Sequence, residues 1–181
     1  MNYHSAERGA LEALQVFETL RTPRGQAACD RLLSMIGLDT DDTDMCVLHA
    51  DRANKTYAKI NDPWGVMETK LLLCQIALYH HDTARARELL EECSRIAVEE
   101  KEPRQHFLLT RGWLEAENGD LDESLESVEA AADVFDQRSR AGDHAPQLLL
   151  RLLRYRWSAH ARARIDAWRL QLNDRTRRGE G

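Results

Sequence analysis

The 181-residue chain has few prolines and glycines to form tight turns, few cysteines to form disulfides, and no long apolar run to anchor it in a membrane. It has 4 prolines and 9 glycines, which is low for a sandwich or barrel that turns every few residues. None of its 4 cysteines forms a CxxC pair, so we expect buried reduced thiols and no metal or other cofactor. No apolar run approaches the ~18 residues of a membrane span, and the N-terminus lacks the apolar segment of a secretory signal. These absences predict a soluble, cytoplasmic protein without membrane contact.

Sequence signatures of catalysis are missing as well. The chain contains no P-loop, dinucleotide-binding glycine pattern, nucleophile elbow or H-E-x-x-H motif. The acidic run at 39–44 only loosely resembles a calcium loop, because Asp44 stands in the glycine position and Ala50 in the final glutamate position. His80 and His81 are adjacent on a predicted helix and would point in different directions. We therefore expect neither an enzyme nor a metal-binding protein.

Charge divides the chain into two parts. Residues 1–142 carry 16 Lys and Arg against 27 Asp and Glu, a balance of −11. Residues 143–181 carry 9 Arg against 4 Asp and Glu, a balance of +5. We interpret residues 1–142 as the folded body and residues 143–181 as a separate basic helix that caps or extends it.

Proline marks an internal repeat. The intervals between Pro23, Pro63, Pro103 and Pro146 are nearly equal, and each is in the range of repeats built from two helices. Because proline is tolerated in the first turn of a helix, this spacing predicts that the same helix start recurs in each repeat. Apolar residues follow helical spacing between the prolines, and no segment shows the alternation of apolar and polar residues that is typical of a strand. The predicted helices are 4–20, 23–37, 43–60, 63–80, 83–100, 103–118, 121–138 and 145–175.

The predicted turns share their chemistry. His81-Asp82 and Gly119-Asp120 stand in equivalent places of successive repeats. The two aspartates are good N-caps, since a short carboxylate accepts the unpaired N–H groups of a first turn. Gly119, and Gly37 after the helix at 23–37, suit the left-handed position that ends a helix.

Two of these repeats resemble the tetratricopeptide repeat (TPR) family in its longer form. The residues that carry the resemblance are Leu73, Cys74, Ala77, His81-Asp82, Ala86, Leu90 and Cys93, then Leu108, Gly112, Gly119-Asp120, Ser124, Val128 and Ala131. The resemblance implies an all-α, right-handed α-solenoid of about three helical hairpins, with an N-terminal helix and a long C-terminal helix. It also implies a concave groove that holds a peptide or partner protein, and no chemistry.

By the geometry of that family, one set of side chains would face the groove. These are Gln75, Tyr79, His106, Trp113 and Glu117. Tryptophan and tyrosine are the types that most often anchor interfaces. The alternative for Trp113 is a place in the core, because it follows Leu109 by one helical turn.

The C-terminal helix is the second candidate interface. One apolar stripe is formed by Trp157, Ala161, Ile165, Trp168 and Leu172, and arginines that include Arg154 flank it. Three interpretations remain open: a solvated cap, a partner or homodimer helix, and a helix that touches an anionic surface such as nucleic acid. The acidic body argues against the last, because it would repel phosphates.

These observations favour a non-catalytic module that binds proteins or peptides, as the sensory or adaptor part of a bacterial regulatory system. The alternative is the homodimerising N-terminal regulatory region of a diguanylate-cyclase-type signalling protein. A nucleic-acid-binding regulator acting through the C-terminal arginines is less favoured.

Overall fold

Helices begin at a regular interval along most of the chain. The computed structural model describes residues 3–99 and 105–131, except 121, 125 and 129. Its helices are α1 (Tyr3–Thr19), α2 (Pro23–Asp39), α3 (Thr43–Lys59), α4 (Pro63–Tyr79), α5 (Thr83–Glu99) and α6 (Gln105–Asn118). The described residues between 122 and 131 are also helical, and no described residue lies in a strand. The all-α prediction is confirmed, and these six helices agree with the predicted bounds within two residues. The predicted helix at 145–175 lies outside the described residues.

The first four turns between helices share one backbone geometry. Arg21, Asp41, Asn61 and His81 all have positive φ, between 50° and 60°. At the α4–α5 turn the N–H of His81 bonds the Leu78 carbonyl at 3.0 Å, and the next N–H bonds the Ala77 carbonyl at 2.8 Å. This pair of bonds is a Schellman ending, which uses carbonyls that the last turn of a helix leaves unpaired.

The residue after each left-handed position starts the next helix. Asp42, Asp62 and Asp82 accept a side-chain hydrogen bond from the backbone N–H three residues later, at 2.9–3.0 Å. Pro23 and Pro63 occupy the first residues of α2 and α4, as predicted. A single residue therefore completes one helix ending and the next residue caps the following helix, so the turns are very short.

Glycine plays two different parts where helices end. Gly119 has φ 90°, which confirms its predicted left-handed position after α6. The same prediction for Gly37 is wrong, because α2 continues to Asp39 and Asp41 takes the positive φ. Gly37 lies instead where α2 crosses α3, and a Cβ there would come within 2.7 Å of the Cys46 backbone nitrogen. The glycine is needed for close helix packing.

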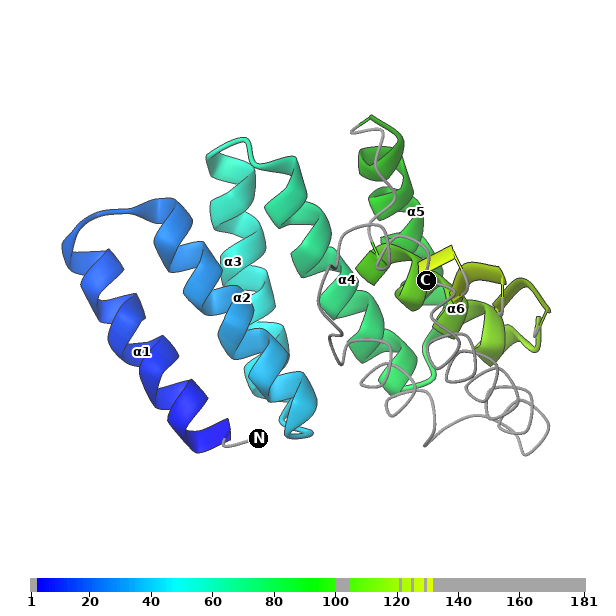
Figure 1. Cartoon of the computed structure of the whole chain (residues 1–181), viewed down its shortest axis with the longest axis horizontal. Helices are drawn as coiled ribbons and strands as arrows, with labels where there is room; N and C mark the ends of the chain where they lie inside the picture. Colours follow the sequence, from blue (N-terminus) through cyan, green and yellow to red (C-terminus); the bar gives the residue numbers. More distant parts are fainter. Residues whose placement is uncertain (1–2, 100–104, 121, 125, 129, 132–181) are drawn as a thin grey trace, which may run out of the picture.

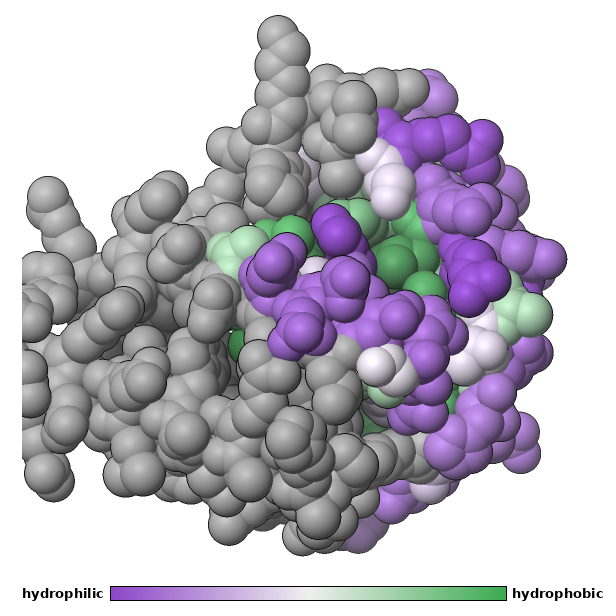
Figure 2. Space-filling view, turned by 90° about the vertical axis from the view of Figure 1, so that its right-hand side faces the viewer, coloured by the Kyte–Doolittle hydropathy of each residue, from purple (hydrophilic) through white to green (hydrophobic). Residues whose placement is uncertain are grey.

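The helices form two layers. Figure 1 shows α1 to α6 following one another along the long axis of the molecule, and each helix packs on the next. The even-numbered helices also contact one another, α2 with α4 and α4 with α6. Figure 2 shows the end opposite α1, where apolar side chains lie between mostly polar ones. The contacts among even-numbered helices make them one continuous layer.

Small residues mark the point where the two helices of a hairpin cross. The Ser34 hydroxyl donates to the Cys46 carbonyl at 2.9 Å, and the Cys74 thiol donates to the Ala86 carbonyl at 3.3 Å in the next hairpin. In the hairpin that follows, the Ser124 hydroxyl donates to a carbonyl of α6 at 2.7 Å. The side chains of Ser34, Cys46, Cys74, Ala86 and Ser124 are all buried. The short side chains let the helix backbones approach closely in every hairpin.

Aromatic rings cover two glycines at equivalent places. The ring of Phe17 lies over Gly25, and one hairpin further on the ring of Tyr57 lies over Gly65. A Cβ on Gly65 would stand only 2.2 Å from the Tyr57 ring. In contrast, a Cβ on Gly9 in α1 would meet nothing within 4 Å.

All four cysteines are buried and reduced. Desolvation by burial raises the pKa of Cys74 and of Cys93 to about 12, so both stay protonated at neutral pH. The interpretation of the cysteines as small core residues is confirmed by their burial. The thiolate is the reactive form, so these side chains are chemically inert while the protein is folded.

The glycine under Tyr57 gives a stability prediction. Gly65→Ala should destabilise the protein by about 1–3 kcal/mol, the usual cost of overpacking a core. Gly9→Ala is the matched control and should stabilise it by up to about 1 kcal/mol, because alanine is the better helix former. Urea unfolding of the three proteins measures both effects. Equal stability of the two variants would contradict the close Tyr57 contact.

The cysteines give a prediction about reactivity. In native protein at neutral pH, Cys74 and Cys93 should not react with an aromatic disulfide reagent on the time scale of free cysteine. All four thiols should react at once in denaturant. Rapid modification of Cys74 or Cys93 in folded protein, located by mass spectrometry, would show that the core is open at α4 and α5.

Candidate functional site: the face of the even-numbered helices

A chain of polar contacts joins the even-numbered helices to one another. We call their layer the even-helix face and define it by side chains of α2, α4 and α6: Arg31, Glu68, Gln75, Tyr79, His106, Thr110, Trp113 and Glu117. These positions recur because α2, α4 and α6 start one hairpin apart and contact one another in sequence. The face therefore spans three helices that are remote in sequence.

Glu68 joins all three of these helices. Its carboxylate lies 3.7 Å from the Arg31 guanidinium of α2 and 3.2 Å from Nδ1 of His106 in α6. The Glu68 side chain is only 16% exposed, so both contacts are partly shielded from water. Shielding strengthens an ion pair relative to a solvated one, and it favours one arrangement of the three side chains.

Gln75 fixes the other side of the His106 ring. The Gln75 amide nitrogen lies 2.9 Å from His106 Nε2 and 2.9 Å from the Thr110 hydroxyl. An amide nitrogen only donates, so Nε2 accepts and the neutral ring carries its proton on Nδ1, where it donates to Glu68. Thr110 is fully buried, and its hydroxyl donates to the His106 carbonyl at 2.9 Å. The polar side chains of this group therefore hold one another in a defined orientation.

Trp113 and Glu117 form a second group, one turn apart on α6. The indole N–H donates to Glu117 at 3.1 Å, and the other Glu117 oxygen lies 3.2 Å from Nδ1 of His81 in the α4–α5 turn. Trp113 also packs against the core shared by α4, α5 and α6. Its ring is thus partly buried in the core, and its place in a groove stays a prediction.

Tyr79 closes α4 at the same end. Its ring stands edge-on to the ring of His80, with centroids 5.3 Å apart. Tyr79 and Trp113 are both partly buried. An aromatic ring on a rigid helix offers large contact area at low cost in conformational entropy.

An ion pair joins α2 to α4 at the other end of the helices. The Arg24 guanidinium donates to Asp62 at 2.7 and 3.1 Å. Burial alone would raise the pKa of Asp62, but the Gly65 N–H and Arg24 outweigh it, and the pKa of Asp62 lies below its usual value. Asp62, the N-cap of α4, is therefore charged over the whole physiological pH range.

A second polar cluster joins α2 to α3. Asp30, 3% exposed, contacts Nδ1 of His49 at 2.7 Å and Arg52 at 3.6 Å. One hairpin further on, Lys70 and Glu92 pair at the equivalent places with the signs reversed. These pairs hold α2 to α3 and α4 to α5, and they do not include residues of the even-helix face.

The structure brings together most of the groove residues that the sequence predicted. Gln75 contacts His106, and Trp113 contacts Glu117. Tyr79 shares a helix with Gln75, and its described ring contact is with His80. The predicted C-terminal interface lies outside the described residues, as does the domain at 143–181.

Arg31, Glu68 and Thr110 were missed by the sequence prediction. The available signal was spacing, since Glu68 precedes His106 by the same interval at which His81 precedes Gly119. Comparing each position of α4 with the position one such interval later in α6 would have paired Glu68 with His106.

The side chains of the face contact one another and the adjacent turn. Among the described residues, no three His, Cys, Asp or Glu side chains are arranged to hold a metal ion. Across the same part of the chain, no helix combines the length and the apolar character needed to cross a bilayer. Glu68, His106 and Glu117 each already contact another side chain of the face or its turn. The face presents partly exposed aromatic rings and hydrogen-bonding groups that hold one another in a fixed orientation.

The lowered pKa of Asp62 gives a pH prediction. Its charge stabilises the fold above its unfolded pKa of about 3.9, and that contribution is lost as the pH falls through the lower folded pKa. Asp62→Asn keeps a good N-cap but removes the charge. We expect this variant to be less stable than wild type at neutral pH, with the gap closing in acid. Urea unfolding across pH 2–7 checks this, and a gap independent of pH would count against the Arg24–Asp62 pair.

No family model matches the chain, and neither a curated protein nor a solved structure matches it.

Proposed function

We propose that the even-helix face binds a protein segment or peptide, and that the chain is a TPR-like, right-handed solenoid acting as a non-catalytic recognition module. The observation that carries this proposal is the network from Arg31 through Glu68 and His106 to Gln75. It orients side chains of three remote helices on one surface, next to the rings of Tyr79 and Trp113.

Preorganisation supports recognition over a purely structural role. The Gln75 amide nitrogen makes two contacts within the network, and Glu68 contacts a partner on each side. A guest would meet side chains that are already ordered, so binding would require little further loss of conformational entropy. The short turns hold the helices themselves in place, which adds to this rigidity.

The charge pattern favours a guest held by apolar and aromatic contact. Arg31, Glu68, His106 and Glu117 are paired with one another or with the adjacent turn. A ligand of high charge would have to break these pairs to gain its own. Nucleic acid would also approach an acidic body, so this alternative is the weaker proposal.

The wider role we propose is that of an adaptor or sensory module in a regulatory system, in which binding at the even-helix face brings a partner to the chain. The basic segment at 143–181 would then connect the array to a further partner. This role depends on the binding proposal and extends it.

A display experiment tests the face. Peptides selected from a random library on the immobilised full chain would be measured by calorimetry. Trp113→Ala and Tyr79→Ala should each weaken binding by about 2 kcal/mol, a factor of about 30 in Kd. Leu48→Ala, at an exposed apolar residue of α3, is the control and should bind as wild type does. Circular dichroism confirms that the variants are folded.

Salt dependence separates the two binding modes. We expect Kd for the selected peptides to change little with ionic strength, because the charges of the face are paired internally. A nucleic-acid binder would lose affinity in proportion to the number of phosphates it neutralises, about one power of salt concentration for each. Peptides that bind both aromatic variants as tightly as wild type, or a steep salt dependence, would contradict the proposal.

A further inference from the structure

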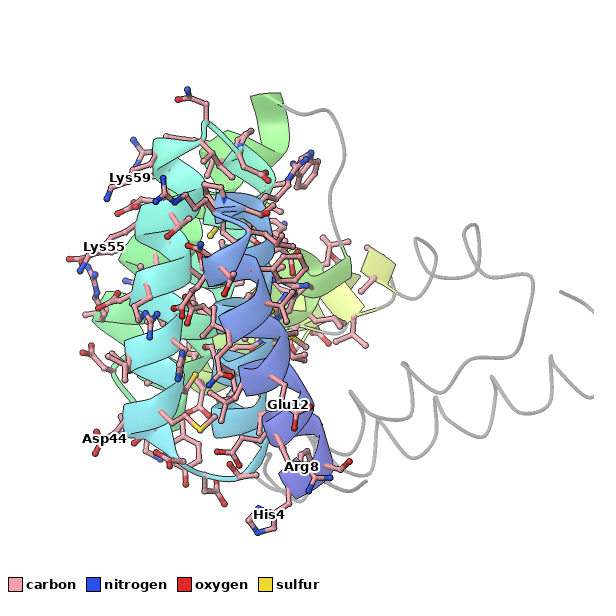
Figure 3. The ribbon with its side chains drawn as sticks, turned by 90° about the vertical axis from the view of Figure 1, so that its left-hand side faces the viewer. His4, Arg8, Glu12, Asp44, Lys55 and Lys59 are labelled. Carbon is pink, nitrogen blue, oxygen red and sulfur yellow. The ribbon has the colours of Figure 1, made fainter. Side chains whose placement is uncertain are left out.

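The outer side of α1 is an exposed helix face with apolar character. We call it the α1 end face and define it by Arg8, Gly9, Glu12, Val16 and Leu20. Val16 is 55% exposed and Leu20 is 65% exposed, and both line a shallow hollow of about 410 Å³ at the same helix. Figure 3 looks onto this end of the molecule, where the labelled Arg8 and Glu12 lie along the outer side of α1.

The internal repeat shows what kind of neighbour this face fits. Gly9 and Glu12 occupy the places in α1 that His49 and Arg52 occupy in α3, one hairpin further on. Those two α3 side chains contact Asp30 of the preceding helix, α2. The same side of α1 has no such neighbour among the described residues, and a Cβ on Gly9 would meet open space. The face therefore has the shape of a surface on which another helix packs.

One apolar position of the face follows the same rule. Leu20 corresponds to Ile60, which is partly buried against Ala27, Ala53 and Tyr57. A repeat array normally ends in a polar face, because an apolar stacking surface left in water favours association. Val16 and Leu20 leave exposed apolar surface at this end among polar side chains, a mixture that is common in interfaces.

The charges on α1 indicate which molecule covers the face. Arg8 and Glu12 are one turn apart, with side chains 76% and 71% exposed, and they lie 4.0 Å from each other. When two copies of this helix pack antiparallel about a two-fold axis between these positions, Arg8 of each copy comes opposite Glu12 of the other. An isologous interface needs this kind of self-complementarity. Two exposed ion pairs would flank the axis, with Val16 and Leu20 covered beyond them.

We propose that the α1 end face binds a second copy of this chain, forming a two-fold symmetric dimer through antiparallel α1 helices. The inference is independent of peptide binding, because the even-helix face lies on α2, α4 and α6. It also differs from pairing through the C-terminal segment, since the residues that carry it belong to α1 and the turn that follows it.

Substitution at the apolar positions is the first test. Sedimentation equilibrium on the full chain should show dimers whose fraction rises with concentration. Val16→Glu and Leu20→Glu should abolish or strongly weaken the dimer without unfolding the chain, since both side chains are exposed. Leu48→Glu is the matched control: Leu48 is 57% exposed and belongs to α3, whose labelled Asp44 and Lys55 point to another side in Figure 3. It should dimerise as wild type does.

Charge reversal tests the symmetry. Arg8→Glu and Glu12→Arg should each weaken dimerisation roughly tenfold or more, because like charges then face each other across the axis. The double variant R8E/E12R restores complementarity and should recover wild-type affinity. A monomer at every attainable concentration would overturn the proposal. So would a dimer that persists in the Val16 and Leu20 variants, or a double variant no better than the single ones.

Discussion

The short turn is the constraint on which the rest of the structure depends. At each of the first four turns one residue adopts the left-handed conformation, which costs about 1–2 kcal/mol for a residue other than glycine. The chain uses arginine, aspartate, asparagine and histidine there, at Arg21, Asp41, Asn61 and His81. The backbone bonds of the turn and the start of the following helix offset this cost. As a result, each of the helices α2 to α5 starts as soon as the previous one ends, so the hairpins α2–α3 and α4–α5 have equal lengths and their even-numbered helices align.

Because the hairpins are equal in length, the position of a residue in its hairpin decides which side chains it contacts, and its type can vary. The site filled by Asp30 and Arg52 in one hairpin holds Lys70 and Glu92 in the next, with the charges exchanged. The hydroxyl that bonds a carbonyl across the hairpin at Ser34 becomes a thiol at Cys74. In both cases the geometry sets the requirement, and any complementary pair meets it. The even-helix face is built in the same way, from positions that the repeat brings together and fills with different side chains.

The sequence predicted the helices well because their ends depend on local chemistry. Proline at 23 and 63, aspartate at 82 and glycine at 119 act within a few residues of themselves, so their spacing alone locates the turns. Gly37 was misjudged because its role is set by Cys46 on another helix. The link from Arg31 to Glu68 was missed for the same reason. Contacts between helices depend on how each helix is rotated about its axis, and a single stripe of apolar residues determines that rotation only approximately.

Turns this short leave little room for length variation. Adding one residue inside a helix would rotate everything beyond it by about 100°, which would move buried positions such as Leu71 to the surface. Adding it at a turn would separate the left-handed residue from the N-cap that follows. The array can therefore tolerate insertions or deletions mainly in units of a whole hairpin. Its length can change by duplication or loss of hairpins, while the internal design of each hairpin stays fixed.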